Sequence, residues 1–290
     1  MLLHERMEHT YFPPSEQIIV NYLLTEELNI SDKTTAQIAK ETFSSKSTIV
    51  KVAKRLQFTG WSDFKKAYIA ELTYLQNHEG GIDANYPFDE KENLLRISQK
   101  IAQLKQEAIA ETQSLLNFKV LKQITDILLQ AKNIHLFALS NNLYLSKEFQ
   151  YNMARIRRRV EIHDILGEGI FAATLALPEE CAIIISYSGE STQLVHFLEI
   201  LRKNRVTTIL ITNIGDSTMA RMADYTLRIA TKERLYTKIA TYANDASITY
   251  LLDVLYSCVF QKDYHTNVEL RRKSSSIFET SRISQHGIKE

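Results

Sequence analysis

Residues 181–191 read CAIIISYSGES, an apolar run that ends in alternating serines, a glycine and a glutamate. An apolar run of this length, bounded by turn residues, predicts a short strand that is buried on both faces of a sheet. The helical pattern TQLVHFLEILRKN begins directly afterwards, at Thr192. In open α/β sheets, ligands bind where the carboxyl end of a strand meets the amino end of the next helix. The stretch therefore predicts a strand of a parallel sheet with a ligand site at its end.

Alternating strand and helix patterns surround this stretch. Strands are predicted at 133–139, 160–164, 182–188, 207–212 and 225–230, and helices at 143–156, 168–177, 192–204, 217–224 and 245–260. Strands that alternate with crossover helices form a parallel sheet with helices on both faces. We therefore expect an α/β three-layer domain with a five-stranded parallel sheet.

The first part of the chain has a different pattern, of short helices. Ser15 is placed to cap a first helix, and Thr34 with Gln37 has the spacing of a capping box before TAQIAKE (35–41). Ser45 is a natural cap for SKSTIVKVAKRLQF (45–58), and a further helix is predicted from Ser62. A tight break between the second and third of these helices is typical of a helix-turn-helix.

Local charge is informative in this region although the net charge of the whole chain is only +1. Residues 44–66 contain six basic side chains and one acid, Asp63. A basic cluster on and after the second helix of a helix-turn-helix is what contact with DNA phosphates requires. The residues expected to contact DNA are Ser45, Lys46, Ser47, Thr48, Lys51, Lys54 and Arg55. The alternative is a solvated helical face on a small bundle that binds protein.

The polar end of the opening stretch has the composition of an anion site. Ser186 and Ser188 alternate along the strand, so both hydroxyls can point the same way. Gly189 lets the backbone approach a ligand closely, and Ser191 opens the next helix, whose free amides attract an anion. The alternative is a serine-rich turn in which Ser191 or Thr192 only caps the helix.

Other sequence features exclude several classes of protein. We find no P-loop, HExxH or CxxC motif and no ligand spacing among the histidines, so no metal and no cofactor are expected. Cys181 and Cys258 lie in apolar runs and are expected to be free, buried thiols. No signal-peptide pattern and no apolar run of membrane-spanning length is present, so we expect a cytoplasmic protein.

The segment TTAQIAKETFSSKSTIVKVAKRLQFTGWSDFKKA (34–67) resembles the N-terminal domain of RpiR-type bacterial transcription regulators. The resemblance rests on the serine–threonine opening of the recognition helix, its basic residue at Lys51, and the closing pattern Gly60, Trp61, Phe64 and Lys65. The family more often has arginine at the position of Lys51. A lysine keeps the positive charge but lacks the planar fork that reads a base in bidentate fashion.

The segment from about Asn133 to Phe260 resembles a sugar isomerase (SIS) domain, and SYSGES matches the SxSGxS/T motif of that family. The resemblance implies that Ser186, Ser188, Gly189 and Ser191 hold the phosphate of a phosphosugar. The family's first strand usually ends in a glycine-x-glycine-x-serine loop. This chain has Ala138, Ser140 and Asn142 at the corresponding positions, so we expect Ser140 and Asn142 in the site and an altered or weaker ligand.

Together these features predict a two-domain transcription regulator of carbohydrate metabolism, and not an enzyme. The expected parts are a helix-turn-helix domain (1–77), a linker with the start of a connecting helix (78–110), an SIS phosphosugar-binding domain (111–262) and a basic C-terminal tail (263–290). The expected partners are double-stranded operator DNA, a phosphorylated sugar effector and a second copy of the chain in a homodimer, with a tetramer left open. Two alternatives stay open: a phosphosugar isomerase with an accessory helical domain, and a regulator whose degenerate sugar site serves only dimerisation.

Overall fold

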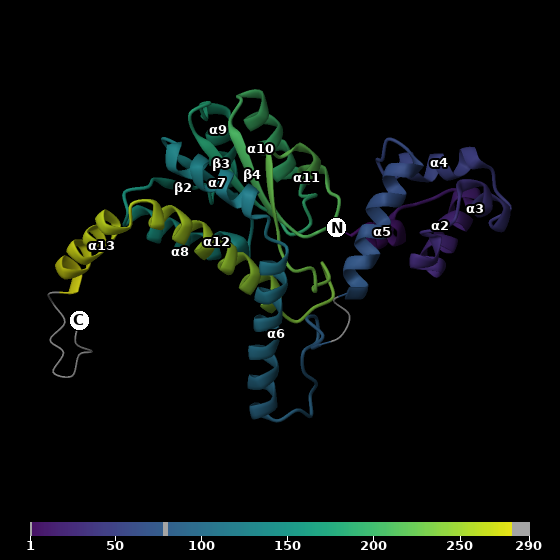
Figure 1. Ribbon diagram of the computed structural model, residues 1–290, viewed down its shortest axis with the longest axis horizontal. Coiled ribbons are helices and arrows are strands. Elements are labelled where there is room, and N and C mark those ends of the chain that lie inside the picture. Colours follow the sequence, from purple (N-terminus) through teal and green to yellow (C-terminus); the bar gives the residue numbers. More distant parts are fainter. Residues whose placement is uncertain (1, 78–80, 280–290) are drawn as a thin grey trace.

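The computed structural model describes residues 2–77 and 81–279 of the chain. Figure 1 shows an all-helical N-terminal part beside a part built around a parallel sheet. No helix within the described ranges is long and apolar enough to cross a membrane. The elements of the N-terminal part are α1 (Leu3–His9), α2 (Pro14–Glu26), the 3-10 helix η1 (Glu27–Ile30), α3 (Thr35–Glu41), α4 (Lys46–Arg55) and α5 (Trp61–Asn77).

The N-terminal helices pack around their own apolar core, which includes Ile19, Ile38, Ile49 and Phe64. The predicted caps before α3 and α4 are present: Thr34 and Gln37 form the capping box, and Ser45 accepts a hydrogen bond from an amide in the first turn of α4. The predicted Ser15 cap is wrong. Helix α2 already begins at Pro14, since a proline in the first turn has no N–H group to leave unsatisfied.

Helix α1 was not predicted from the sequence, because seven residues carry too short a periodic pattern. Its first amides, those of Leu3 and His4, donate to the Glu71 carboxylate of α5 at 2.7 and 2.9 Å. Long-range contacts of this kind stabilise a helix that is too short to form alone.

The elements of the second part, in chain order, are α6 (Leu94–Ser114), α7 (Phe118–Gln130), β1 (Ile134–Ala138), α8 (Asn141–Ala154), β2 (Val160–Ile162), α9 (Leu166–Leu175), β3 (Cys181–Ile185), α10 (Thr192–Lys203), β4 (Thr207–Thr212), α11 (Thr218–Met222), β5 (Tyr225–Arg228), α12 (Tyr242–Lys262) and α13 (Tyr264–Glu279). The strands form one parallel sheet in the order β2-β1-β3-β4-β5. The predicted five-stranded parallel sheet is therefore confirmed.

Both faces of the sheet are covered, so the domain has the predicted three layers. Side chains of β3 alternate between two apolar cores: Ile183 and Ile185 face α7, α8 and α12, whereas Ala182 and Ile184 face α10 and its neighbours. All five residues of β3 are buried, which is why its sequence is continuously apolar.

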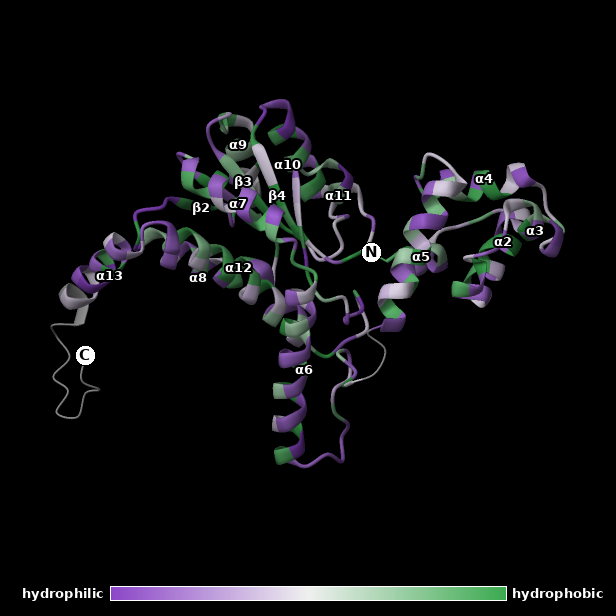
Figure 2. Ribbon diagram, viewed as in Figure 1, coloured by the Kyte–Doolittle hydropathy of each residue, from purple (hydrophilic) through white to green (hydrophobic). Residues whose placement is uncertain are grey.

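The connection between the two parts, predicted as a linker with the start of a connecting helix, makes specific contacts with the second part. The chain at Ala84 and Asn85 is buried, and the Asn85 side chain accepts a hydrogen bond from the amide of Arg234 at 2.7 Å. Helix α6 starts only at Leu94, after an Asn93 cap, and a second cap at Asn117 begins α7 as a separate helix. Figure 2 shows hydrophilic and hydrophobic bands alternating along α6, which packs against α12.

The C-terminal segment that was predicted as a basic tail contains helix α13 up to Glu279. Arg155 donates to the hydroxyls of Ser274 and Ser275 at 3.1 and 2.6 Å, so these α13 side chains contact the end of α8. Residues 280–290 of the predicted tail lie outside the described residues.

Candidate functional site

The predicted ligand residues follow the carboxyl ends of two neighbouring strands, β1 and β3. Strands β1 and β3 are neighbours, and the chain leaves β1 toward β2 on one side and β3 toward β4 on the other. This reversal of strand order is the point at which ligands bind in open α/β sheets. The fold brings the loop containing Ser140 and Asn142 beside the loop 186–191.

The loop 186–191 is closely held. Ser186 is buried, and its amide continues the ladder by donating to the Ile211 carbonyl at 3.0 Å. The Gly189 amide donates to the Ser186 carbonyl at 3.2 Å, and the Glu190 amide donates to the Ser188 hydroxyl at 3.2 Å. Ser191 is the residue before α10, and its side chain makes no capping hydrogen bond. The loop therefore leads directly to the positive end of a twelve-residue helix, a place that favours an anion.

Gly189 occupies a position that only glycine fits without strain. Its φ is +64°, and a Cβ added there would lie 2.1 Å from the Ser217 hydroxyl and 2.6 Å from the Ser217 Cβ. The Gly189 carbonyl also accepts the amide of Met219 at 3.1 Å. The glycine thus packs the loop onto the start of α11, in addition to any approach to a ligand.

The loop after β1 has an irregular backbone at Ser140, whose φ is +51° although it is not glycine. Asn142 lies in the first turn of α8 and is half-buried. Its neighbour Asn141 donates to the Asp245 carboxylate at 2.8 Å and to the Thr241 hydroxyl at 3.2 Å. Asn141 is an amide of this loop that the sequence did not single out, since its partners come from a distant helix.

Glu190 connects the loop to the N-terminal domain. Its carboxylate accepts the amide of Thr218 at 2.9 Å and lies 3.4 Å from the guanidinium of Arg6. Arg6 is nearly buried, and it also donates to the Asp216 carbonyl at 2.5 Å and to the Leu56 carbonyl at 3.0 Å. Burial lowers the pKa of Arg6, and the charge of Glu190 opposes that shift. Leu56 is the C-cap of α4, so one guanidinium contacts both the SYSGES loop and the end of α4.

A second arginine reinforces this contact. Arg221 of α11 donates to the Gln57 carbonyl at 2.7 Å, and its guanidinium lies over the Phe58 ring. Arg221 is held in turn by the Asp216 carboxylate at 3.1 Å. The sequence could not reveal either arginine as a bridge, because each contact spans more than 150 residues or joins a side chain to a carbonyl.

The predicted DNA-contact residues extend along α4, from its N-cap Ser45 to its last residue, Arg55. The Ser45 hydroxyl accepts the Thr48 amide at 3.1 Å and lies 2.7 Å from the Ser47 hydroxyl, so the start of the helix presents a cluster of hydroxyls. Along the helix, the side chains of Lys46, Lys51 and Lys54 are exposed.

Arg55 differs from these lysines. Its guanidinium binds the buried carboxylate of Glu16 through two hydrogen bonds of 2.6 and 3.3 Å. This ion pair joins α4 to α2. Arg55 is thus paired with Glu16 while its side chain stays 41% exposed.

Comparison with known proteins gives two family matches. Residues 1–74 match the model of the helix-turn-helix domain of the rpiR family, and residues 127–252 match that of the SIS domain. The chain is 24% identical over 281 residues to an uncharacterized HTH-type transcriptional regulator of Bacillus subtilis, covering 96% of both proteins. It is 26% identical over 280 residues to one of Haemophilus influenzae, covering 93% of both.

Among solved structures, the fold is similar to that of the Vibrio vulnificus NanR protein complexed with ManNAc-6P. The TM-score is 0.64 at 18% identity, and the match covers 97% of this chain and 100% of that one. The order of the two matched domains and the near full-length agreement with named regulators confirm the resemblance drawn from the sequence. The chain belongs to the RpiR family of helix-turn-helix transcriptional regulators and carries an SIS domain.

Proposed function

We propose that this regulator controls genes of carbohydrate metabolism by binding a two-fold operator as a homodimer and sensing a phosphorylated sugar at the loop 186–191. The observation that carries the proposal is the path of contacts from Glu190 in that loop, through Arg6, to the end of α4. A regulator that binds operator DNA acts where the DNA is, so we place it in the cytoplasm.

The residues of the loop support a phosphate as the bound group. Ser186 and Ser188 supply hydroxyls, and the open amino end of α10 supplies amides and a positive dipole. The similar NanR structure contains ManNAc-6P, a phosphorylated sugar. In the facing loop, Ser140 and Asn142 add a hydroxyl and an amide that can bond to sugar oxygens.

The Arg6 contacts supply a physical route from ligand to DNA. A phosphate at the amides of this loop brings negative charge close to the Glu190 carboxylate, and like charges repel. Binding therefore favours an arrangement in which the contacts of Glu190 and Arg6 change. Because Arg6 also holds the Leu56 carbonyl, that arrangement differs in the position of α4. This difference between two states is what allows a ligand to alter operator affinity.

We propose binding without turnover. An isomerase needs a carboxylate placed to move a proton between adjacent carbons. Glu190 is held by Thr218 and Arg6, and the buried Glu233 accepts two amides at the start of α12. Both carboxylates are occupied with protein groups. Conversion of sugar phosphates by the purified full-length protein would establish the isomerase alternative.

A thermal-shift screen tests the ligand. The full-length protein is heated with hexose and pentose phosphates and with amino sugar phosphates including ManNAc-6P, and inorganic phosphate serves as the control for the anion alone. A ligand at a hundred times its Kd adds about 2.7 kcal/mol to stability. Ser188→Ala should abolish the shift, whereas Ser276→Ala, an exposed serine of α13, should not. No shift with any sugar phosphate would favour the degenerate site that serves only dimerisation.

Operator binding is tested with Lys51→Ala against Lys122→Ala. Both replace an exposed lysine, but Lys122 lies on α7 in the SIS domain. Fluorescence anisotropy with DNA from upstream of its own gene should show weaker binding for Lys51→Ala only. The slope of log affinity against log salt should become shallower by about 1.8, because the homodimer loses one phosphate contact in each protomer. Identical slopes for the two variants would exclude Lys51 as a phosphate contact.

The route is tested with Arg6→Ala against Arg96→Ala, which removes an exposed arginine of α6. We expect the Arg6 variant to keep its thermal shift with the sugar phosphate but to lose the effect of that ligand on operator affinity. Such coupling typically amounts to a 5- to 150-fold change in affinity. A ligand effect of wild-type size in the Arg6 variant would refute this route while leaving the ligand site intact.

A further inference from the structure

A second polar cluster lies on the sheet, away from the loop 186–191. His135 of β1 pairs in register with Glu161 of β2, and His163 follows β2 directly. Alternation along the two strands places these three side chains on the same face of the sheet, the face that α9 and α10 cover. One ligand atom from each residue lies within 4.8 Å of the others.

The nitrogen atoms of the two histidines are close together. Nδ1 of His135 lies 3.1 Å from Nε2 of His163, and it lies 3.9 Å from Oε2 of Glu161. Zinc–nitrogen bonds of 2.0–2.1 Å in a tetrahedral site place two nitrogens about 3.3 Å apart. The observed spacing is therefore close to that of two imidazoles sharing one metal ion.

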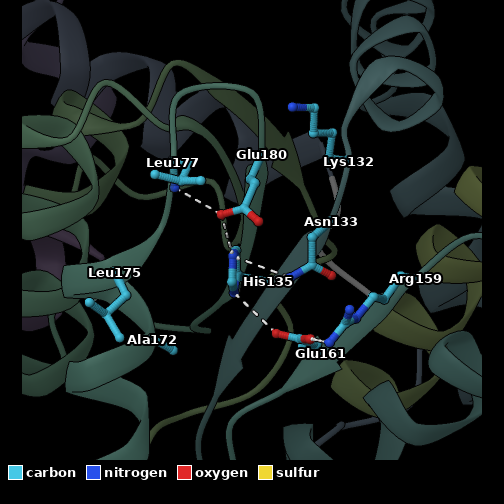
Figure 3. A pocket seen from close by; sticks show the side chains of 9 residues that line it. All are labelled: Lys132, Asn133, His135, Arg159, Glu161, Ala172, Leu175, Leu177 and Glu180. Atoms are coloured by element: carbon cyan, nitrogen blue, oxygen red, sulfur yellow. Dashed lines mark hydrogen bonds and ion pairs between the residues drawn. The ribbon is translucent and has the colours of Figure 1, made fainter.

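The remaining groups orient His135 for this role. Its other ring nitrogen, Nε2, lies 3.1 Å from the carboxylate of Glu180, which is fixed by the Leu177 amide at 2.8 Å. A carboxylate only accepts, so Nε2 carries the proton and Nδ1 presents its lone pair to the cluster. A carboxylate behind a histidine is the usual support of a metal-binding imidazole. Figure 3 shows His135 between the carboxylates of Glu180 and Glu161.

Two of the three side chains, His135 and Glu161, line a cavity, whereas His163 is half-buried and does not line it. A cavity of about 420 Å³ is lined by His135, Glu161 and Glu180, with Leu175 and Leu177 on the side of α9. Arg159 binds Oε1 of Glu161, which leaves Oε2 facing the histidines. Solvent from the cavity can supply a fourth ligand.

We propose that His135, Glu161 and His163 form a binding site for a divalent transition metal, with Zn²⁺ as the best fit to two imidazoles and one carboxylate. The proposal is independent of the sugar site, because the loop 186–191 contributes no residue to it. A metal ion there joins β1 to the three-residue edge strand β2 and to the start of the α9 connection. Without a metal, the same side chains form a hydrogen-bonded chain from His163 to Glu180. Measuring metal uptake therefore distinguishes a metal site from a purely hydrogen-bonded cluster.

Metal binding by the full-length protein tests the site. After treatment with EDTA, we expect the chain to take up Zn²⁺ in calorimetry and Co²⁺ with the visible absorption bands of a tetrahedral complex. His163→Ala should lose one equivalent of Zn²⁺ per chain and the cobalt bands. His196→Ala, which removes an exposed histidine of α10, should lose neither.

Two further variants test the carboxylate behind His135 and provide an alternative if His163→Ala does not fold. Glu180→Gln keeps an acceptor for His135 and should weaken Zn²⁺ binding roughly 10- to 100-fold. If His163→Ala does not fold, as judged by far-UV circular dichroism in EDTA, Glu161→Gln takes its place, because the Glu161 side chain is partly exposed. Equal zinc uptake and equal cobalt spectra in the wild type and the folded variant would overturn the site, as would a wild type that binds neither metal.

Discussion

Replacement of Gly189 by alanine should destabilise the SIS domain strongly. The left-handed backbone costs an alanine about 1–2 kcal/mol. The new Cβ would lie 2.1 Å from the Ser217 hydroxyl, so that hydroxyl must give up its hydrogen bond to the Ala220 amide. Loss of this helix cap costs about 1 kcal/mol of stability. The 2.6 Å approach to the Ser217 Cβ cannot be relieved by rotation, so the backbone must shift at a cost of about 1–3 kcal/mol. We expect a total loss of about 3–6 kcal/mol.

Urea unfolding followed by far-UV circular dichroism measures this loss. Ser217→Gly removes both atoms that lie closer than 3 Å, so Gly189→Ala in that background should cost less, about 1–2 kcal/mol for the backbone conformation. The 3.2 Å approach of the new Cβ to the Thr212 hydroxyl remains. Gly167→Ala is the matched control, because Gly167 has open space around it and lies in the first turn of α9, where alanine is favoured. A Gly189→Ala midpoint equal to that of the wild type would refute the close approach of Gly189 and Ser217.

Three further predictions concern other parts of the fold. Ser45→Ala removes the cap of α4 and should cost about 1 kcal/mol, measured by the fluorescence of Trp61, the single tryptophan, during unfolding; an unchanged midpoint would mean that the cap contributes nothing. Burial raises the pKa of the Cys181 thiol to about 12, so a disulfide reagent at pH 8 should modify Cys258 but spare Cys181 in the native protein, and two rapidly reacting thiols would contradict this. Burial also raises the pKa of Glu71 above its usual 4.5, against the effect of the amides that bond to it. The folded chain then binds that proton more tightly than the unfolded chain, so the stability of Glu71→Gln relative to the wild type should increase as the pH rises above about 4.5, and a difference that does not vary with pH would contradict the shift.

The order of strands and helices could be predicted because each element has its own pattern. The continuous apolar run of β3 and the 3.6-residue period of α10 depend only on neighbours in the chain. The caps Thr34 and Ser45 were also predicted, since a cap bonds to amides two or three residues away. Helix α1 and the docked segment at Asn85 were missed, because their stability comes from groups far away in the sequence.

Contacts between residues that are distant in the sequence were also missed at the candidate sites. The expectation of no metal rested on the absence of short ligand spacings, yet His135 and His163 are 28 residues apart and meet only because β1 pairs with β2. Arg55 stays a predicted DNA contact, but its ion pair with Glu16 of another helix could not be predicted from the basic run in which it lies.

The sequence by itself determined the two-domain plan and the serine-rich end of β3, because periodicity, caps and a six-residue motif are local properties. Tertiary structure alone decided what that motif touches. Gly189 packs on Ser217, and Glu190 reaches Arg6, which in turn holds the end of α4 at Leu56. Such contacts form only when separate elements pack together. A contact between residues nearly two hundred positions apart produces no local sequence pattern, so it could not be predicted from the sequence.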